Sequence, residues 1–194
     1  MDDDDHQVDE SAGTTREGLR AALRAAASAL RADGPAFALG GSYALWVHGG
    51  PEPVHDVDLV VAQTDTEAAA GTLGAAGFRI DRPPEDWLFK ATLDGAVVDV
   101  LHRLNAVPVA AETLAVAEVH QVLAIEVPVL PPTLVLTVKL RALDEHSCDF
   151  AKLLPAVRAV RERVDWSRVR AETADNDFAT VFLILLERLG ITNT

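Results

Sequence analysis

Two aspartates, Asp56 and Asp58, stand two positions apart in a segment with the pattern of a β-strand. Side chains two positions apart on a strand project from the same face, so these two carboxylates are expected side by side. Such groups repel each other and are costly to bury unless a cation lies between them. Mg²⁺ suits them, because it takes a few carboxylates and completes its octahedron with water and phosphate oxygens. The pattern predicts a Mg²⁺ site with Asp56 and Asp58 as ligands.

A third carboxylate, Asp99, stands inside the apolar run from Val97 to Val100. This run follows Asp94-Gly95, a dipeptide that is a strong signal for a β-hairpin. If the strand that carries Asp99 pairs next to the strand of Asp56, Asp99 joins the same site. It would act there either as a metal ligand or as the base for an incoming hydroxyl group.

A glycine turn, Gly40-Gly41-Ser42, follows a short apolar strand and opens a helical segment. Such a turn exposes backbone N–H groups at the positive end of a helix, an arrangement that binds phosphate. The Ser42 hydroxyl can add a further hydrogen bond. We therefore expect Gly40, Gly41 and Ser42 to bind the phosphates of a nucleotide.

The order of these motifs resembles the signature of the polymerase-β-type nucleotidyltransferase superfamily. The signature is an apolar residue with Gly-(Gly/Ser), here residues 39–42, then thirteen intervening residues and Asp-x-Asp, here residues 56–58. The resemblance implies an α+β fold, a mixed sheet flanked by helices with a C-terminal helical subdomain. It also implies an enzyme that uses Mg²⁺ to transfer a nucleoside monophosphate from a nucleoside triphosphate, such as ATP or CTP, to an acceptor hydroxyl. Asp99 falls where this superfamily has its third carboxylate.

The segments 131–142 and 148–154 resemble the helical region of the AbiEii/MenT-like minimal nucleotidyltransferases. This resemblance implies that Lys139 contacts triphosphate oxygens and that Asp149 positions Lys139 or the acceptor, so both count as catalytic candidates. Those proteins are toxins of toxin-antitoxin pairs, which makes the 3′ end of tRNA the leading acceptor and a cognate antitoxin the expected partner. Val54-His55 stands where many relatives have an arginine.

Several alternatives remain open at this stage. Lys139 can be an ordinary exposed helix residue, and Asp149 can be the N-cap of the helix that follows it. Lys90 either faces the substrate or is a solvated charge. The chain has only three lysines, and an acidic surface repels RNA but attracts a cationic compound such as an aminoglycoside. A small-molecule nucleotidyltransferase is therefore one alternative, and a catalytically silent nucleotide-binding or protein-binding module is another.

Hydrophobic periodicity predicts the elements that hold these residues. The expected helices span about 19–33, 43–48, 66–76, 133–144, 148–163 and 177–189. The expected strands span 37–39, 56–61, 78–80, 87–93 and 96–101, and 118–129 has the pattern of further extended chain.

Composition sets the broader limits. Of the net charge of −13, −6 belongs to the first ten residues, which contain no Lys or Arg. We predict a disordered acidic tail over 1–14, a nucleotidyltransferase core over 15–131 and the helical subdomain over 132–194. The longest apolar runs are too short for a membrane span, and residues 2–5 lack the basic character of a signal peptide. A single cysteine, Cys148, predicts a reducing, cytoplasmic location.

Overall fold

A computed structural model describes residues 15–192, so the predicted acidic tail over 1–14 lies outside the described residues. The helices are α1 (Arg16–Asp33), α2 (Gly41–Val47), α3 (Thr66–Ala75), α4 (Ala111–Ala115), α5 (Pro132–Arg141), α6 (Phe150–Val160), α7 (Trp166–Glu172) and α8 (Asp177–Arg188), with short 3₁₀ turns at Gln63–Asp65 and Arg161–Arg163. The strands are β1 (Phe37–Leu39), β2 (Val57–Val61), β3 (Arg79–Asp81), β4 (Leu88–Leu93), β5 (Ala96–Leu101), β6 (Arg103–Leu104), β7 (Val107–Pro108), β8 (Glu118–Val122) and β9 (Ile125–Val129).

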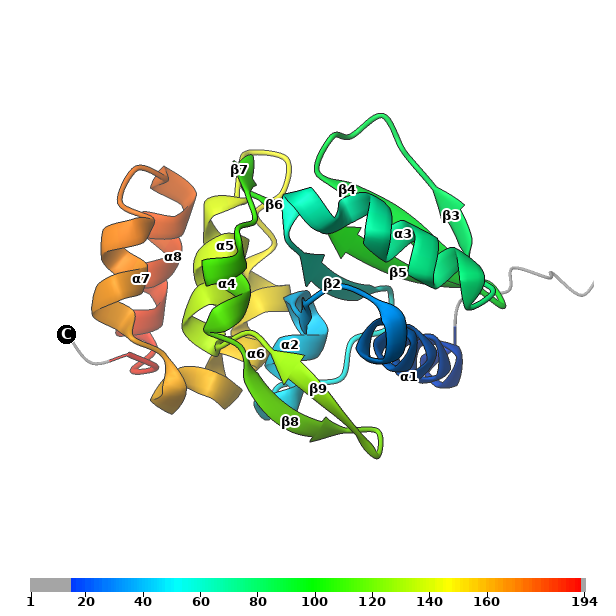
Figure 1. The fold of residues 1–194 in the computed structure, drawn as a ribbon. Helices are drawn as coiled ribbons and strands as arrows, with labels where there is room; N and C mark the ends of the chain where they lie inside the picture. Colours follow the sequence, from blue (N-terminus) through cyan, green and yellow to red (C-terminus); the bar gives the residue numbers. More distant parts are fainter. Residues whose placement is uncertain (1–14, 193–194) are drawn as a thin grey trace, which may run out of the picture.

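The centre of the fold is a seven-stranded mixed sheet with the strand order β3-β4-β5-β2-β1-β9-β8 (Figure 1). The strands β4 and β5 form the hairpin predicted from Asp94-Gly95. The strands β2 and β5 pair in parallel, and β1 runs antiparallel to β2. The pairing of β2 with β5 joins the two segments whose carboxylates were expected to meet.

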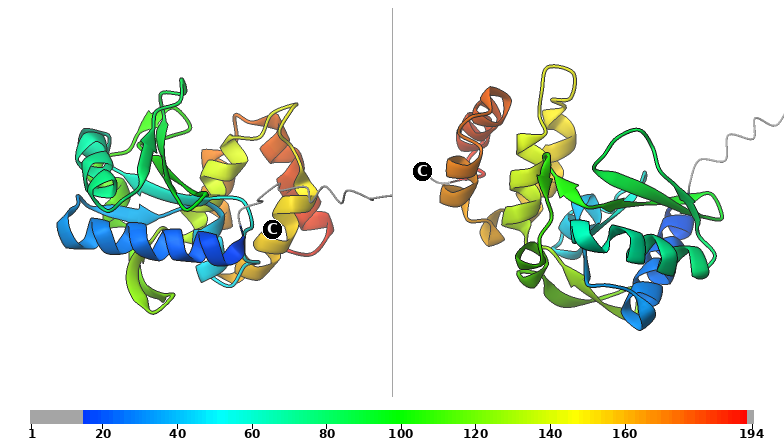
Figure 2. Two further views of the ribbon diagram at one scale, coloured as in Figure 1. Left: turned by 90° about the vertical axis from the view of Figure 1, so that its right-hand side faces the viewer. Right: turned by 45° about the horizontal axis from the view of Figure 1, so that its top comes forward.

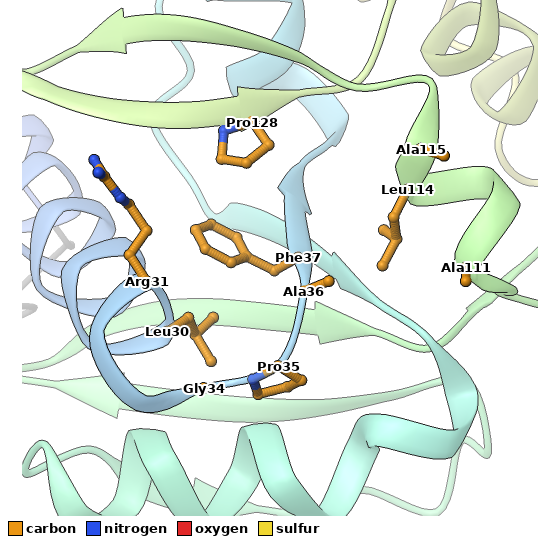
Figure 3. Close-up of a pocket in the computed structure, with 10 residues that line it drawn as sticks. All are labelled: Leu30, Arg31, Gly34, Pro35, Ala36, Phe37, Ala111, Leu114, Ala115 and Pro128. Carbon is orange, nitrogen blue, oxygen red and sulfur yellow. The ribbon is translucent and has the colours of Figure 1, made fainter.

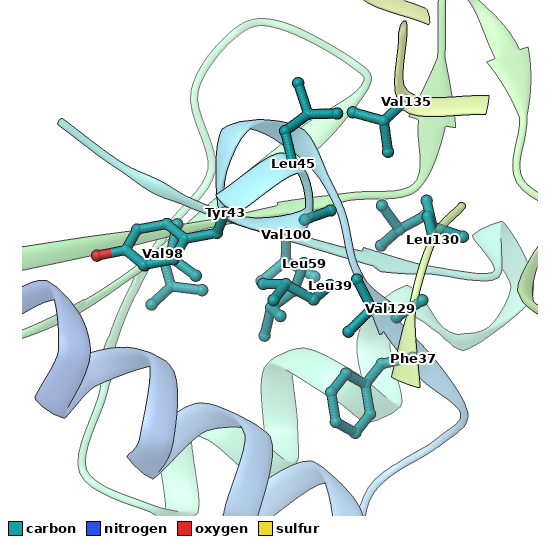
Figure 4. Close-up of a cluster of buried hydrophobic side chains, with 14 of the residues drawn as sticks. Phe37, Leu39, Tyr43, Leu45, Leu59, Val98, Val100, Val129, Leu130 and Val135 are labelled. Atoms are coloured by element: carbon teal, nitrogen blue, oxygen red, sulfur yellow. The ribbon is translucent and has the colours of Figure 1, made fainter. Parts of the chain in front are cut away.

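One face of the sheet is covered by α1 and α3, which pack side by side against it (Figure 1). Helix α1 begins where the Thr15 side chain accepts a hydrogen bond from the Gly18 N–H, and it buries the apolar stripe that predicted it. The main cluster of buried side chains lies between this helix and the strands; Figure 4 labels Leu39, Leu59 and Val100 among them. Alternation along β2 and β5 sends Asp58 and Asp99 to the opposite face.

The helices α5 to α8 form the C-terminal part of the fold, beside the sheet (Figure 2). Helix α5 contacts α2 on one side and α7 and α8 on the other. Three of these helices begin at side chains that accept a backbone N–H, namely Asp149, Asp165 and Asn176. A domain boundary at residue 131 stays a prediction. None of the helices within residues 15–192 is long and apolar enough to cross a membrane.

The structure confirms the predicted fold class and differs from the sequence analysis in its short elements. The run 118–129 is a hairpin, β8–β9, rather than one extended segment. Helices α4 and α7 and the small β6–β7 ribbon were not predicted. Asp56 precedes β2 instead of lying in it.

We expect Ala124→Gly to stabilise the protein, contrary to the usual effect of that substitution. Leu123 and Ala124 form the β8–β9 turn with φ of 51° and 66°, a left-handed conformation that costs a non-glycine residue about 1–2 kcal/mol. After the loss of chain entropy for glycine, a net gain of about 0.5–1 kcal/mol remains. Urea unfolding measures this gain in the free energy of unfolding. The matched control is Ala68→Gly on the exposed side of α3, which should lose about 1 kcal/mol; equal losses in both variants would contradict the prediction.

Candidate active site

The three predicted carboxylates meet in one cluster at the sheet. The parallel register of β2 and β5 places Asp58 directly opposite Asp99, and Asp56 lies just before β2. One oxygen of each carboxylate lies within 4.8 Å of the other two. Among the described residues, this is the one cluster of three or more acidic, histidine or cysteine side chains with the spacing of a metal site.

Lys90 on β4 is the cationic partner of this cluster. It lies opposite Asp99 in the β4–β5 register, and its Nζ donates a hydrogen bond to Asp99 Oδ1 at 3.0 Å. The Asp99 carboxylate is nearly buried, with 11% of its side chain exposed. The sequence left Lys90 open between a substrate contact and a solvated charge; the hairpin register that follows from Asp94-Gly95 was the signal that could have paired it with Asp99.

Burial raises the pKa of Asp58 to about 6, and the negative charges of Asp56 and Asp99 act in the same direction. The positive charge of Lys139 and a hydrogen bond from the Ser42 N–H partly oppose this rise. The cluster is therefore short of positive charge. Three carboxylates with little room between them are the oxygen ligands that a hard divalent cation such as Mg²⁺ prefers, so the residues fit the predicted ion.

The glycine turn is shaped by Asp58. The Gly40 N–H donates a hydrogen bond to the Asp58 carbonyl oxygen at 2.8 Å. Gly41 has φ +52°, and a Cβ at this position would overlap the Asp58 carboxylate. The Ser42 N–H is also bound to that carboxylate. These contacts seat α2 against the aspartates, and Ser42 also lines a cavity that it shares with Lys139.

Lys139, on α5, lies next to the glycine turn and Asp58. It lines a small cavity of about 120 Å³ together with Gly40, Gly41 and Asp58. It also lines a neighbouring cavity of about 490 Å³, together with Ser42 and Asp149. The side chain of Lys139 is partly buried, and no carboxylate in the described part of the chain lies within ion-pair distance of it.

Asp149 is separate from the aspartate cluster. It caps α6, where its Oδ1 accepts a hydrogen bond from the Lys152 N–H at 3.3 Å, and its Oδ2 lies 3.3 Å from Lys152 Nζ. These contacts with Lys152 hold the pKa of Asp149 below its usual value. The capping role that the sequence left open is therefore present. A role in positioning Lys139 or the acceptor stays a prediction.

Another hollow, of about 460 Å³, lies between the end of α1 and α4 (Figure 3). Its lining is apolar apart from Arg31, whose guanidinium donates to the carbonyl oxygen of Glu126 at 2.9 Å. It contains none of the predicted site residues.

Comparison with known proteins shows a similarity in fold to solved structures. No family model and no curated protein sequence matches the chain. Among solved structures, the antibiotic-resistance factor ANT(2″)-Ia in solution aligns with a TM-score of 0.61 at 13% identity, over 92% of this chain and 100% of that one. Its crystal structure with adenylyl-2″-tobramycin aligns with a TM-score of 0.60 at 13% identity, over 84% and 98%. The chain has the nucleotidyltransferase fold. A Thermotoga maritima protein assigned to the same class, TM1012, aligns with a TM-score of 0.54 at 15% identity, over 72% and 92%.

The raised pKa of Asp58 predicts an unusual dependence of stability on pH when divalent cations are removed. The folded state binds this proton with a pKa of about 6, whereas the unfolded chain binds it near the ordinary value of about 3.9. The Asp58 contribution to the free energy of unfolding is therefore fully present below pH ~4 and is lost as pH rises through ~6, by about 3 kcal/mol at most. Mg²⁺ binds ionised carboxylates, so its stabilising effect should grow over the same range.

Urea unfolding in EDTA between pH 4 and pH 8 checks this prediction. Subtracting the profile of Asp58→Asn from that of the wild type removes the contributions of other acids. A difference that is flat with pH would mean that the Asp58 carboxyl group titrates normally.

Proposed function

We propose that the chain is a Mg²⁺-dependent nucleotidyltransferase that moves a nucleoside monophosphate from a nucleoside triphosphate to an acceptor hydroxyl. The observation that carries this proposal is the meeting of Asp56, Asp58 and Asp99 on two neighbouring parallel strands, next to a glycine turn and Lys139. The fold shared with nucleotidyltransferases supports it. Phosphoryl transfer needs mainly positioning and charge neutralisation, which such a cluster can provide.

In the proposed reaction the acceptor oxygen forms a bond to the α-phosphorus, and the bond from that phosphorus to the bridging oxygen of the β-phosphate breaks. Pyrophosphate leaves with the electron pair, and the acceptor proton passes to the Asp99 carboxylate. Lys90 donates to one Asp99 oxygen at 3.0 Å, so it holds the carboxylate in place while the other oxygen stays available for the acceptor. When bound by Asp56 and Asp58, Mg²⁺ would neutralise charge on the triphosphate; Asp99 would be a third ligand only where it does not act as the base.

The triphosphate tail is assigned to Ser42 and Lys139. Both side chains line the cavity of about 490 Å³, where Lys139 has no carboxylate partner within the described residues and is free to bind phosphate oxygens. The Gly41 backbone lies beside them, against Asp58. Lys152 lines the same cavity, although its charge is already paired with Asp149.

For the acceptor, the charge distribution supports a small cationic molecule such as an aminoglycoside. Several basic side chains near the site are already paired with carboxylates: Lys90 with Asp99, Arg103 with Asp86 and Lys152 with Asp149. Such pairs leave little free positive charge to bind the backbone of a nucleic acid. ANT(2″)-Ia, whose fold the chain shares, was captured with an adenylylated tobramycin. The 3′ end of tRNA as acceptor and an antitoxin as partner stay predictions from the sequence.

The test incubates the wild type with Mg²⁺, each α-labelled nucleoside triphosphate in turn, and either an aminoglycoside panel or total tRNA. We expect label on an aminoglycoside with the wild type and none with Asp58→Asn. The matched control is Asp94→Asn, which removes one exposed carboxylate from the β4–β5 turn and should keep full activity. Label on tRNA would restore the toxin prediction for the acceptor. Absence of transfer to either acceptor with all four nucleotides would favour the catalytically silent module.

A further inference from the structure

A larger cavity opens beside the aspartate cluster. It has a volume of about 520 Å³, and its lining includes Trp87, Leu101, Arg103 and Asn105. Three of its lining residues, Leu101, Leu104 and Val138, also line the small cavity that contains Asp58, so the two spaces adjoin. Leu101 lies two positions after Asp99 on β5 and therefore on the same face of the sheet. The cavity thus begins next to the third carboxylate.

The walls of this cavity are mainly apolar, and they include the aromatic ring of Trp87. The Trp87 side chain precedes β4 and is 43% exposed, which leaves part of its indole available for contact. Leu101, Leu104 and Val138 supply aliphatic surface. A planar aromatic ligand can stack on an exposed indole, and such stacking is a main source of affinity for nucleobases.

Two polar groups in the lining have unused hydrogen-bonding capacity. Arg103 Nε is buried and has no hydrogen-bond partner, although Arg103 Nη1 lies 3.3 Å from Asp86 Oδ2. Asn105 Nδ2 donates to the Val138 carbonyl oxygen at 3.0 Å, which fixes the amide and leaves its Oδ1 as an acceptor. Arg103 Nε is enclosed by the protein, so a ligand reaches it only if the guanidinium moves. The Asn105 Oδ1 acceptor has no such restriction, and it matches a donor on the edge of a nucleobase.

The chemistry of the lining does not suit the cationic acceptor. Asp86 is the one carboxylate among the residues that line this cavity, and it is paired with Arg103. The small cavity lined by Asp58 and Lys139 shares lining residues both with this apolar cavity and with the polar cavity of Ser42 and Lys139, so it adjoins both. A single nucleotide can therefore span both, with phosphates on the polar side and the base on the apolar side.

We propose that the cavity lined by Trp87, Arg103 and Asn105 is the nucleobase subsite, in which the base stacks on the Trp87 indole. This inference rests on the proposed function, because it requires the triphosphate to lie at the aspartates. It adds the residues that read the base: Trp87 supplies stacking, and Asn105 Oδ1 contacts the base edge.

The test uses tryptophan fluorescence, with binding rather than turnover as the readout. The double variant Trp46→Phe/Trp166→Phe leaves Trp87 as the single tryptophan of the chain. It is titrated, in Mg²⁺, with α,β-methylene analogues of ATP, GTP, CTP and UTP and, separately, with inorganic tripolyphosphate. We expect at least one nucleotide to quench Trp87, whereas tripolyphosphate should stabilise the protein against heat without quenching.

Trp87→Ala should raise the Kd for the nucleotide analogue about tenfold or more and leave the Kd for tripolyphosphate unchanged. Trp87→Phe should recover most of the affinity. Trp166→Phe is the matched control, since Trp166 Nε1 is bound to the Arg161 carbonyl oxygen in the C-terminal helices, away from the cavity.

The outcomes separate this inference from the proposed function. If tripolyphosphate binds in an Asp58-dependent way while Trp87→Ala binds nucleotide like the wild type, the base lies elsewhere and only the subsite is wrong. A Trp87→Ala variant that raises KM for the acceptor alone would assign the cavity to the acceptor instead. If neither tripolyphosphate nor any nucleotide binds, the proposed function and the proposed subsite are both wrong.

Discussion

Asp58→Asn is expected to lower the transfer rate by about a thousandfold and, at the same time, to make the metal-free protein more stable at pH 8. The rate is expected to fall because the variant loses a proposed Mg²⁺ ligand, and a loss of about 4 kcal/mol of transition-state stabilisation corresponds to that factor. The stability rises because the Asp58 carboxylate, with its pKa raised to about 6, is unfavourable when ionised beside Asp56 and Asp99. We expect a gain of up to about 3 kcal/mol in the free energy of unfolding.

Steady-state kinetics and urea unfolding in EDTA measure the two effects. Asparagine keeps the shape of the side chain and can still accept the hydrogen bond from the Ser42 N–H, so a folding defect is not expected. Asp94→Asn is again the matched control, and it should change neither quantity. A variant that is slower but no more stable would show that the native cluster is not strained by its own charges.

Gly41→Ala has the second large expected effect, a loss of Mg²⁺ binding and of transfer from the addition of one methyl group. The new Cβ would overlap the Asp58 carboxylate, and the backbone φ of +52° disfavours a residue with a side chain by about 1–2 kcal/mol. Relief of the overlap requires either the carboxylate or α2 to move. We expect at least a hundredfold weaker Mg²⁺ affinity, measured by titration calorimetry.

Gly190→Ala separates backbone strain from displacement of Asp58. Gly190 has φ +64°, close to the value at Gly41, but a Cβ there would meet nothing within 4 Å. This control should lose a similar increment of stability from strain and keep its Mg²⁺ affinity. Unchanged Mg²⁺ affinity in Gly41→Ala would mean that the Asp58 carboxylate can move at little cost and that its predicted role as a fixed ligand is wrong.

The sequence predicted the long elements well because they have strong local signals. The apolar stripe from Leu19 to Leu30 marked α1, and Asp94-Gly95 marked the β4–β5 hairpin. It missed the β8–β9 and β6–β7 turns because Leu123-Ala124 and Asn105-Ala106 take positive φ values without the glycine that usually signals such turns. Helix α4, at five residues, is too short to show a hydrophobic period.

For the site, the identity of the three aspartates could be predicted, but their meeting could not be derived from local pattern. Parallel pairing of β2 with β5 is a long-range contact, which the sequence analysis could state only as a condition and the family resemblance supported. Gly41 was expected to bind phosphate; the structure adds that Asp58 leaves no space for a side chain there. Lys90 was left open although the register of the Asp94-Gly95 hairpin could have paired it with Asp99. The Trp87 cavity was missed because it depends on neighbours that only the folded chain brings together.

The parallel pairing of β2 with β5 also bears on how the chain reaches its native state. The two strands are far apart in the sequence, so the loop between them must close before they can pair, and the formation of such non-local contacts is slow. Here closure also brings Asp58 opposite Asp99, so like charges oppose the step that completes the sheet. A divalent cation that binds only the closed cluster would favour the folded population by mass action. Free Mg²⁺ would then set how much of this protein is folded, as well as how fast the folded protein works.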